Sequence, residues 1–284
     1  MPTVCVSLDA VSGDTAELLM AGLAAIGYHA FEEKETQLHA YIDAPLYDPG
    51  AIPELLADLG LPDVPYQAEE LPEKNWNEAW EKSFSPVRIG NQILIRAAFH
   101  PADPGFPHEI IIHPKMSFGT GHHATTESMM RLMLQQDFTA ATVLDFGSGT
   151  GILSILAARL GATRVLAIDE EEWAMENSRE NILLNGFTED RIIVKQDARF
   201  QFGWPDGRPG LFDFILANIN RNILLRAMEE MTQALKPGGR LLISGFYEAD
   251  RMVLDPELTG RGLRPMQALI SDRWCAMIWE QPGS

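Results

Sequence analysis

The segment VLDFGSGTG, residues 143–151, joins an apolar strand to a glycine-rich turn, and the helical sequence ILSILAARLG follows it. Glycines allow a tight turn and let a ligand approach the backbone, and the helix behind them offers free N–H groups. The pattern D-x-G-x-G-x-G comprises Asp145, Gly147, Gly149 and Gly151. The dinucleotide fingerprint G-x-G-x-x-G would need glycine where Ile152 stands, so NAD is disfavoured. No G-x-x-x-x-G-K-[ST] segment occurs, which excludes a P-loop.

Outward from this turn, apolar strands and helical segments alternate from residue 124 to residue 245. This alternation predicts an α/β domain with a mostly parallel sheet and helices on both of its faces. The last two segments, LRPMQALIS and RWCAMIWEQ, read as strands with no helix between them. A hairpin of that kind at the end of the sheet would leave one strand antiparallel.

Three polar side chains are expected where strands of this sheet end. Asp169 closes the strand VLAID, twenty-two residues after Gly147, and a carboxylate there can accept hydrogen bonds from both hydroxyls of a ribose. The alternative is that Asp169 caps the next helix, and one side chain could serve both roles. Asp197, expected at the rim of an adenine site, and Asn218 end the following strands. All of them should surround one crevice beyond the carboxyl ends of the strands. The alternative for Asn218 is that it only ends its strand and has no contact with a ligand.

The segment FGTGHHATT, residues 118–126, places two adjacent histidines before a predicted helix that starts near Ala124. A metal site at His122 and His123 would need further ligands. His113 and Asp145 are possible ligands, but no ligand spacing supports them, so we expect no metal. The two histidines are predicted to be structural, in a loop that caps the helix.

The N-terminal part follows the order strand, helix, strand, strand, helix, strand over residues 1–70, which is typical of a ferredoxin-like α+β unit. Residues 1–65 contain eleven Asp or Glu and one Lys, so ten of the eighteen excess negative charges lie in less than a quarter of the chain. This asymmetry favours a docking face for a basic partner.

A connector is predicted over residues 71–92. Trp76 and Trp80 are four residues apart and would share one face of a helix, where packing is favoured over ligand contact. The segments NQILIRAAF and HEIIIHP then predict two more strands. The expected organisation is a substrate-recognition domain over 1–70, the connector, and a catalytic domain over 93–284.

Composition narrows the possible partners and compartments. The net charge is −18, from 22 basic and 40 acidic side chains, which disfavours direct binding of nucleic acid. Cys5 and Cys275 form neither a disulfide framework nor a zinc motif. The first residues lack a basic signal-peptide region, and no apolar run approaches the ~20 residues of a membrane span. We therefore expect a cytoplasmic protein, and a monomer.

These motifs together resemble the class I S-adenosylmethionine-dependent methyltransferases, and most closely the PrmA-type ribosomal protein methyltransferases. That family has segments similar to Ser117-FGTGHHATT, DFGSGTG and Ala217-Asn218-Ile219, a W-x-x-x-W connector and a terminal RWCAMI. The resemblance spans about residue 70 to the end. It implies a Rossmann-like domain that binds S-adenosylmethionine, with Thr126 at the cofactor, Phe118 in the pocket wall and Asn218 orienting the acceptor amine.

The resemblance also implies a substrate. It points to lysine ε-amines and the N-terminal α-amine of the stalk-base protein of the large ribosomal subunit, the eleventh in the usual naming. Two alternatives remain open from the sequence. One is a methyltransferase for another protein or a small amine. The other is no enzyme at all, but an acidic, chaperone-like binder of a basic ribosomal protein.

Overall fold

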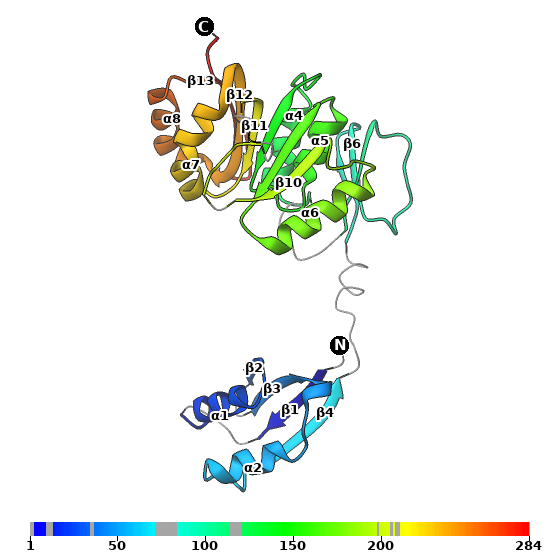
Figure 1. The fold of residues 1–284 in the computed structure, drawn as a ribbon, viewed down its shortest axis with the longest axis vertical. Helices are drawn as coiled ribbons and strands as arrows, with labels where there is room; N and C mark the ends of the chain where they lie inside the picture. Colours follow the sequence, from blue (N-terminus) through cyan, green and yellow to red (C-terminus); the bar gives the residue numbers. More distant parts are fainter. Residues whose placement is uncertain are drawn as a thin grey trace. The chain divides into compact units, whose positions relative to one another are not determined.

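The computed structural model of the chain describes residues 3–9, 14–34, 37–71, 84–113, 121–197, 199–204, 207 and 211–283. The chain forms two compact units, Met1–Ala79 and Trp80–Ser284 (Figure 1). Trp76 and Trp80, the tryptophans of the expected connector, lie outside the described residues. No helix within the described ranges is both long enough and apolar enough to cross a membrane.

The first unit is a four-stranded antiparallel sheet with strand order β2-β3-β1-β4, which confirms the ferredoxin-like prediction. Its elements follow the expected order: β1 (Thr3–Leu8), α1 (Asp14–Ala25), β2 (Ala30–Lys34), β3 (Gln37–Asp43), the 3₁₀ turn η1 (Ala44–Leu46), α2 (Ala51–Asp58) and β4 (Tyr66–Leu71).

Successive side chains of β1 point to opposite faces of this sheet. Val4, Val6 and Leu8 are buried in one cluster together with Leu19 of α1 and Ile52 of α2. Both helices therefore cover the same face (Figure 1). The other face carries the intervening side chains and is covered by no helix of the described part of this unit.

The second unit contains two sheets and the remaining helices. Its elements are β5 (Val87–Ile89), β6 (Ile93–Arg96), β7 (His108–Ile111), α4 (Ala124–Met133), β8 (Thr142–Phe146), α5 (Ile152–Arg159), β9 (Arg164–Asp169), α6 (Glu172–Leu184), β10 (Ile192–Gln196), β11 (Phe212–Asn218), α7 (Arg221–Ala234), β12 (Leu235–Tyr247), the 3₁₀ turn η2 (Glu248–Asp250), α8 (Arg251–Gly260), β13 (Arg264–Ser271) and β14 (Trp274–Glu280).

The large sheet has seven strands in the order β10-β9-β8-β11-β12-β14-β13. Strands β8 to β12 are parallel to one another, whereas β14 is antiparallel to both β12 and β13. The predicted parallel sheet and its single antiparallel strand are therefore confirmed. The chain order reverses at β8, because β9 and β10 lie on one side of it and β11 and β12 on the other.

Helices cover both faces of this sheet (Figure 1), and alternate residues of each strand enter different clusters. Val143 of β8 packs with α4, α5 and α6, whereas its neighbour Leu144 packs with α7 and α8. A strand that is buried on both faces has a nearly continuous apolar sequence, and the segment FDFILAN of β11 is an example.

Two elements were missed in the sequence. Strand β5 lies within the range expected as connector, where it pairs with β6 in a three-stranded sheet that β7 completes. Helix α8 contains Pro256, a residue that normally argues against a helix interior. Its apolar side, Leu254 and Leu258, is fully buried against the large sheet, and this packing outweighs the unfavourable proline.

Ile215, in the middle of the central strand β11, tests the core. Its side chain is fully buried, so Ile215→Ala should lower the free energy of unfolding of this unit by about 2–5 kcal/mol, and Ile215→Val by about 0.5–1.5 kcal/mol. Chemical denaturation measures both changes. The control Leu183→Ala, at a side chain that is 65% exposed, should change little. Equal losses for the Ile215 and Leu183 variants would contradict the assigned core.

Candidate functional site

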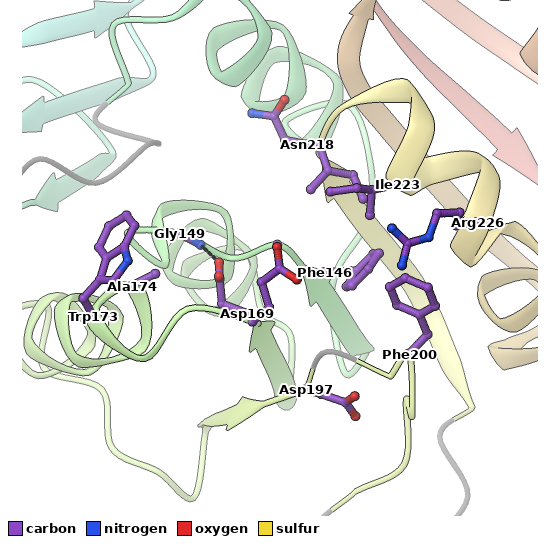
Figure 2. A pocket seen from close by; sticks show the side chains of 13 residues that line it. Phe146, Gly149, Asp169, Trp173, Ala174, Asp197, Phe200, Asn218, Ile223 and Arg226 are labelled. Carbon is purple, nitrogen blue, oxygen red and sulfur yellow. Dashed lines mark hydrogen bonds between the residues drawn. The ribbon is translucent and has the colours of Figure 1, made fainter.

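A pocket of about 260 Å³ lies at the carboxyl ends of the parallel strands, beside the point where the strand order reverses. Ligands of open α/β sheets bind at this position. Figure 2 shows the side chains that surround it, which come from the ends of β8, β9, β10 and β11 and from α6 and α7. Five of the residues predicted from sequence line it: Gly147, Gly149, Asp169, Asp197 and Asn218.

The turn after β8 depends on its glycines. Gly147, Gly149 and Gly151 have φ angles of 74°, 52° and 76°, in the left-handed region that other residues rarely adopt. A Cβ atom at 147 would overlap Cγ2 of Ile219, and one at 151 would lie 2.5 Å from Oγ of Ser178. The turn is therefore restricted to glycine both by its conformation and by the close packing around it.

Asp169 fixes this turn. One carboxylate oxygen accepts a hydrogen bond from the Gly149 N–H at 2.9 Å (Figure 2), and the other accepts from the Glu171 N–H at 3.1 Å. Helix α6 has Glu171 as its N-cap, so Asp169 precedes the cap and does not occupy it. An ionised carboxylate has about four acceptor positions. Asp169 can therefore hold the turn and still accept from the hydroxyls of a ligand.

Asp197, expected at the rim of an adenine site, lines the pocket and also holds its own loop. Its carboxylate accepts hydrogen bonds from the backbone N–H groups of Arg199 at 2.7 Å and Gln201 at 3.1 Å, and from Lys195 Nζ at 3.0 Å. These bonds use most of its acceptor positions. They also position the intervening residue, Phe200.

Phe200 forms an apolar wall that the sequence analysis missed. Its φ of 57° is unusual for a bulky residue, and the Asp197 bonds on either side hold the loop in this conformation. The ring contacts Phe146 edge-on at 5.5 Å, and the Arg226 guanidinium lies 5.5 Å from its centre (Figure 2). The two rings, together with Ile223, provide a surface suited to a flat heteroaromatic group.

Asn218, at the end of β11, lines the pocket and contacts Thr126 of α4. Asn218 Nδ2 donates to Thr126 Oγ1 at 3.3 Å, and Thr126 is fully buried in the first turn of α4. Asn218 Oδ1 is buried and has no hydrogen-bond partner among the described residues. A buried amide oxygen without a partner is costly, and a ligand that donates an N–H to it would remove this cost.

Asp145 lies beneath the glycine turn, outside the set of residues that line the pocket. One of its oxygens accepts from Ser154 Oγ at 2.7 Å, and the other has no partner in the described part of the chain. The pKa of Asp145 is raised to about 7, mainly by burial; the Ser154 hydrogen bonds oppose this rise, and the charge of Asp169 adds to it.

The histidines of FGTGHHATT have structural contacts. His122 Nε2 donates to the carbonyl of Ser85 at 2.9 Å. His123 is the N-cap of α4, where its Nδ1 accepts from the Thr125 N–H at 3.3 Å. Across the residues that the structure covers, no three His, Cys, Asp or Glu side chains are grouped to bind a metal ion. Phe118 lies outside the described residues.

Comparisons with known proteins agree with this geometry. A model of the family described as ribosomal protein L11 methyltransferase (PrmA) matches residues 14–282. A relative named ribosomal protein L11 methyltransferase from Porphyromonas gingivalis is 44% identical over 273 residues, which are 95% of this chain and 92% of that protein. One of the same name from Chlorobaculum tepidum is 33% identical over 279 residues, covering 95% and 94%.

A solved structure supports the same assignment. The ribosomal protein L11 methylase of Lactobacillus delbrueckii subsp. bulgaricus aligns with a TM-score of 0.61 and 25% identity, over 70% of this chain and 98% of that one. The matched family model spans nearly the whole sequence, both units included. The chain therefore belongs to the PrmA family of ribosomal protein L11 methyltransferases.

Proposed function

We propose that this protein transfers methyl groups from S-adenosylmethionine to amines of ribosomal protein L11, namely lysine ε-amines and the N-terminal α-amine. The observation that carries the proposal is the pocket bounded by the glycine turn, Asp169 and Asn218, together with the buried Oδ1 of Asn218, which has no partner among the described residues. Family membership adds the substrate, since the relatives are named for it.

The pocket residues fit this cofactor. Asp169 retains acceptor capacity for the two ribose hydroxyls, and Phe146, Phe200 and Ile223 suit an adenine ring. Bound in this pocket, S-adenosylmethionine would supply an electrophilic methyl group, which an amine lone pair can take while the sulfur keeps the electrons of the broken bond. Ile219 and Ile223, which line the pocket with Asn218, are apolar and suit the stem of a flexible aliphatic amine.

Asn218 orients the acceptor amine in this proposal. Thr126 holds the Asn218 side chain through Nδ2, which leaves Oδ1 to accept an N–H of the incoming amine. A fixed acceptor aligns the amine lone pair, and such positioning supplies much of the rate of displacement reactions. No protein group is assigned as a base, so the amine loses its proton to solvent before the attack.

The N-terminal unit is proposed to recognise the protein substrate. The face of its sheet that lacks helices carries Glu32, Asp43 and Glu69, and residues 1–65 hold most of the excess negative charge. Opposite charge speeds encounter with a basic partner. A ribosomal substrate also favours a cytoplasmic location, and because both predicted roles lie within one chain, a monomer would suffice.

Methyl transfer to purified proteins tests the function. The full-length chain, labelled S-adenosylmethionine and purified L11 should yield labelled L11, with the sites located by peptide mass spectrometry. Label on small amines but not on L11 would favour a small-molecule methyltransferase. Binding of L11 without any transfer would favour the chaperone-like alternative, and either outcome would contradict the proposal.

Asp169→Ala should weaken binding of S-adenosylmethionine about tenfold to a hundredfold, since a hydrogen bond to a charged group contributes roughly 1.5–3 kcal/mol. The variant also frees the Gly149 N–H, so the loss should lie toward the upper end. Calorimetric titration measures it. Glu176→Ala, an exposed acidic side chain on α6, is the matched control. Unchanged affinity of the Asp169 variant would refute the ribose contact.

The chemical step should accelerate with pH. A lysine amine with a pKa of about 10.4 is neutral in only ~0.1% of molecules near pH 7.4, and only the neutral form attacks. Single-turnover rates at saturating cofactor should therefore rise roughly tenfold per pH unit. Asp145, whose pKa is raised to about 7 by burial, would itself titrate in this pH range. The variant Asp145→Asn cannot titrate there, so its rates give the pH dependence without this contribution. A flat profile from pH 6.5 to 9 in both proteins would show that the site deprotonates the amine itself.

Removing charge from the helix-free face of the N-terminal sheet should weaken substrate docking. The double variant Glu32→Gln/Glu69→Gln should raise the KM for L11 and reduce its dependence on salt, because screening acts on these charges. Cofactor affinity should stay unchanged. The control Glu54→Gln/Asp58→Asn removes the same charge from α2, on the opposite face. Equal effects of both pairs would show that only net charge matters.

A further inference from the structure

Strand β12 contains a bulge that reverses the direction of its last side chains. Ile243 pairs with Met277 of β14, but Phe246 pairs with Cys275, so β12 has one residue more than its partner at this point. Side chains alternate between the faces of a sheet, and one extra residue exchanges them. As a result Phe246 joins the cluster under α7 and α8, and Tyr247 turns to the face that α4 covers.

Gly245 makes this bulge possible. Its φ is 94°, and a Cβ atom there would lie 2.7 Å from the carbonyl carbon of Ile219 and still closer to its oxygen. The backbone that follows Asn218 therefore packs directly on the bulge. The N–H of Ile219 also donates to the carbonyl of Ser244 at 3.1 Å. The acceptor side of the pocket and the end of β12 are thus one packed unit.

An aromatic path connects Tyr247 to the acceptor side. Its ring packs on Trp274 with centres 4.4 Å apart, and Trp274 contacts the ring of His123 edge-on at 4.8 Å. The carbonyl of His123 accepts from the N–H of Thr126 at 3.0 Å, and Thr126 binds Asn218. Tyr247 is 49% exposed, so one face of its ring is covered by Trp274 and much of the rest is accessible.

A second route holds Tyr247 in place. Its backbone N–H donates to Asp250 Oδ2 at 2.9 Å, and Asp250 Oδ1 accepts from Arg221 at 2.8 Å. Arg221 begins α7, three residues after Asn218. Ser244 is the residue of β12 that pairs with Asn218 of β11. Tyr247 lies three residues farther along β12, which corresponds to roughly 10 Å from Ser244 at ~3.3 Å per residue.

We propose that Tyr247, backed by Trp274, is a wall of the channel through which the acceptor lysine reaches Asn218. The ring would pack on the aliphatic stem and attract the ammonium and the methylated amine, since aromatic faces favour alkylammonium groups. This assignment rests on the proposed function and adds a substrate-positioning residue to it. Retention of the methylated cation would favour repeated transfer to the same nitrogen.

Kinetics of Tyr247 variants test the proposal. Tyr247→Leu should raise the KM for L11 about threefold to thirtyfold, the range expected for loss of one ring–cation contact, and should shift the products toward fewer methyl groups per lysine. Tyr247→Phe keeps the ring and should restore both values. Affinity for S-adenosylmethionine should stay within twofold in each variant. Phe99→Leu, which removes another ring that is about half exposed, should leave KM and product distribution unchanged.

Unaltered KM and product distribution in Tyr247→Leu would overturn the proposal. Equal defects in Tyr247→Leu and Tyr247→Phe would assign the effect to the hydroxyl and overturn the role of the ring. If the wild type transfers no methyl group to L11 at all, the proposed function fails, and that result is seen before any variant is compared.

A binding measurement that does not depend on turnover tests the role of Tyr247 even if the wild type transfers no methyl group to L11. Protein labelled with 5-fluorotryptophan, in complex with S-adenosylhomocysteine, would be titrated with tetramethylammonium and followed by ¹⁹F NMR. The Trp274 resonance, assigned with Trp274→Phe, should shift to saturation in the wild type and not in Tyr247→Leu. A shift of equal size in both proteins, or none in either, would contradict an alkylammonium site at this ring.

Discussion

The hydrogen bond from the Gly149 N–H to the Asp169 carboxylate joins the first turn of the sheet to the end of the neighbouring strand. It requires a turn of glycines with positive φ angles, and it requires an acid at the last position of β9. Because β8 and β9 are adjacent and parallel, both groups reach the same edge. The pocket exists where this pair meets the end of β11, at the reversal of strand order.

Three aspartates follow or end neighbouring strands, and their surroundings give them different tasks. Asp145 is enclosed beneath the turn with Ser154, where burial raises its pKa to about 7. Asp197 accepts three hydrogen bonds, two from its own loop and one from Lys195. Asp169 also lines the pocket, but it accepts only two backbone hydrogen bonds and so retains more acceptor capacity. The same residue type thus stabilises a turn, shapes a wall or is proposed to bind a ribose, depending on which donors surround it.

The fold was predictable because its signals are local. Glycine turns, apolar strands and the acid at the end of β9 can each be read from a short segment, and their order implies a parallel sheet. The parts that were missed depend on contacts distant in sequence. Phe200 becomes a wall through Asp197 and Arg226, α8 tolerates Pro256 through its buried side, and Tyr247 changes face through a bulge against Ile219. No periodicity in the sequence reports such packing.

The most direct test of this account is a crystal structure of the protein with S-adenosylhomocysteine and a lysine peptide from L11. We expect both ribose hydroxyls within hydrogen-bond distance of Asp169, the adenine against Phe200, and the lysine amine at Asn218 Oδ1. The Gly149–Asp169 bond should persist in the complex. A nucleoside bound away from Asp169, or a lysine amine that approaches from a side remote from Asn218, would contradict the account.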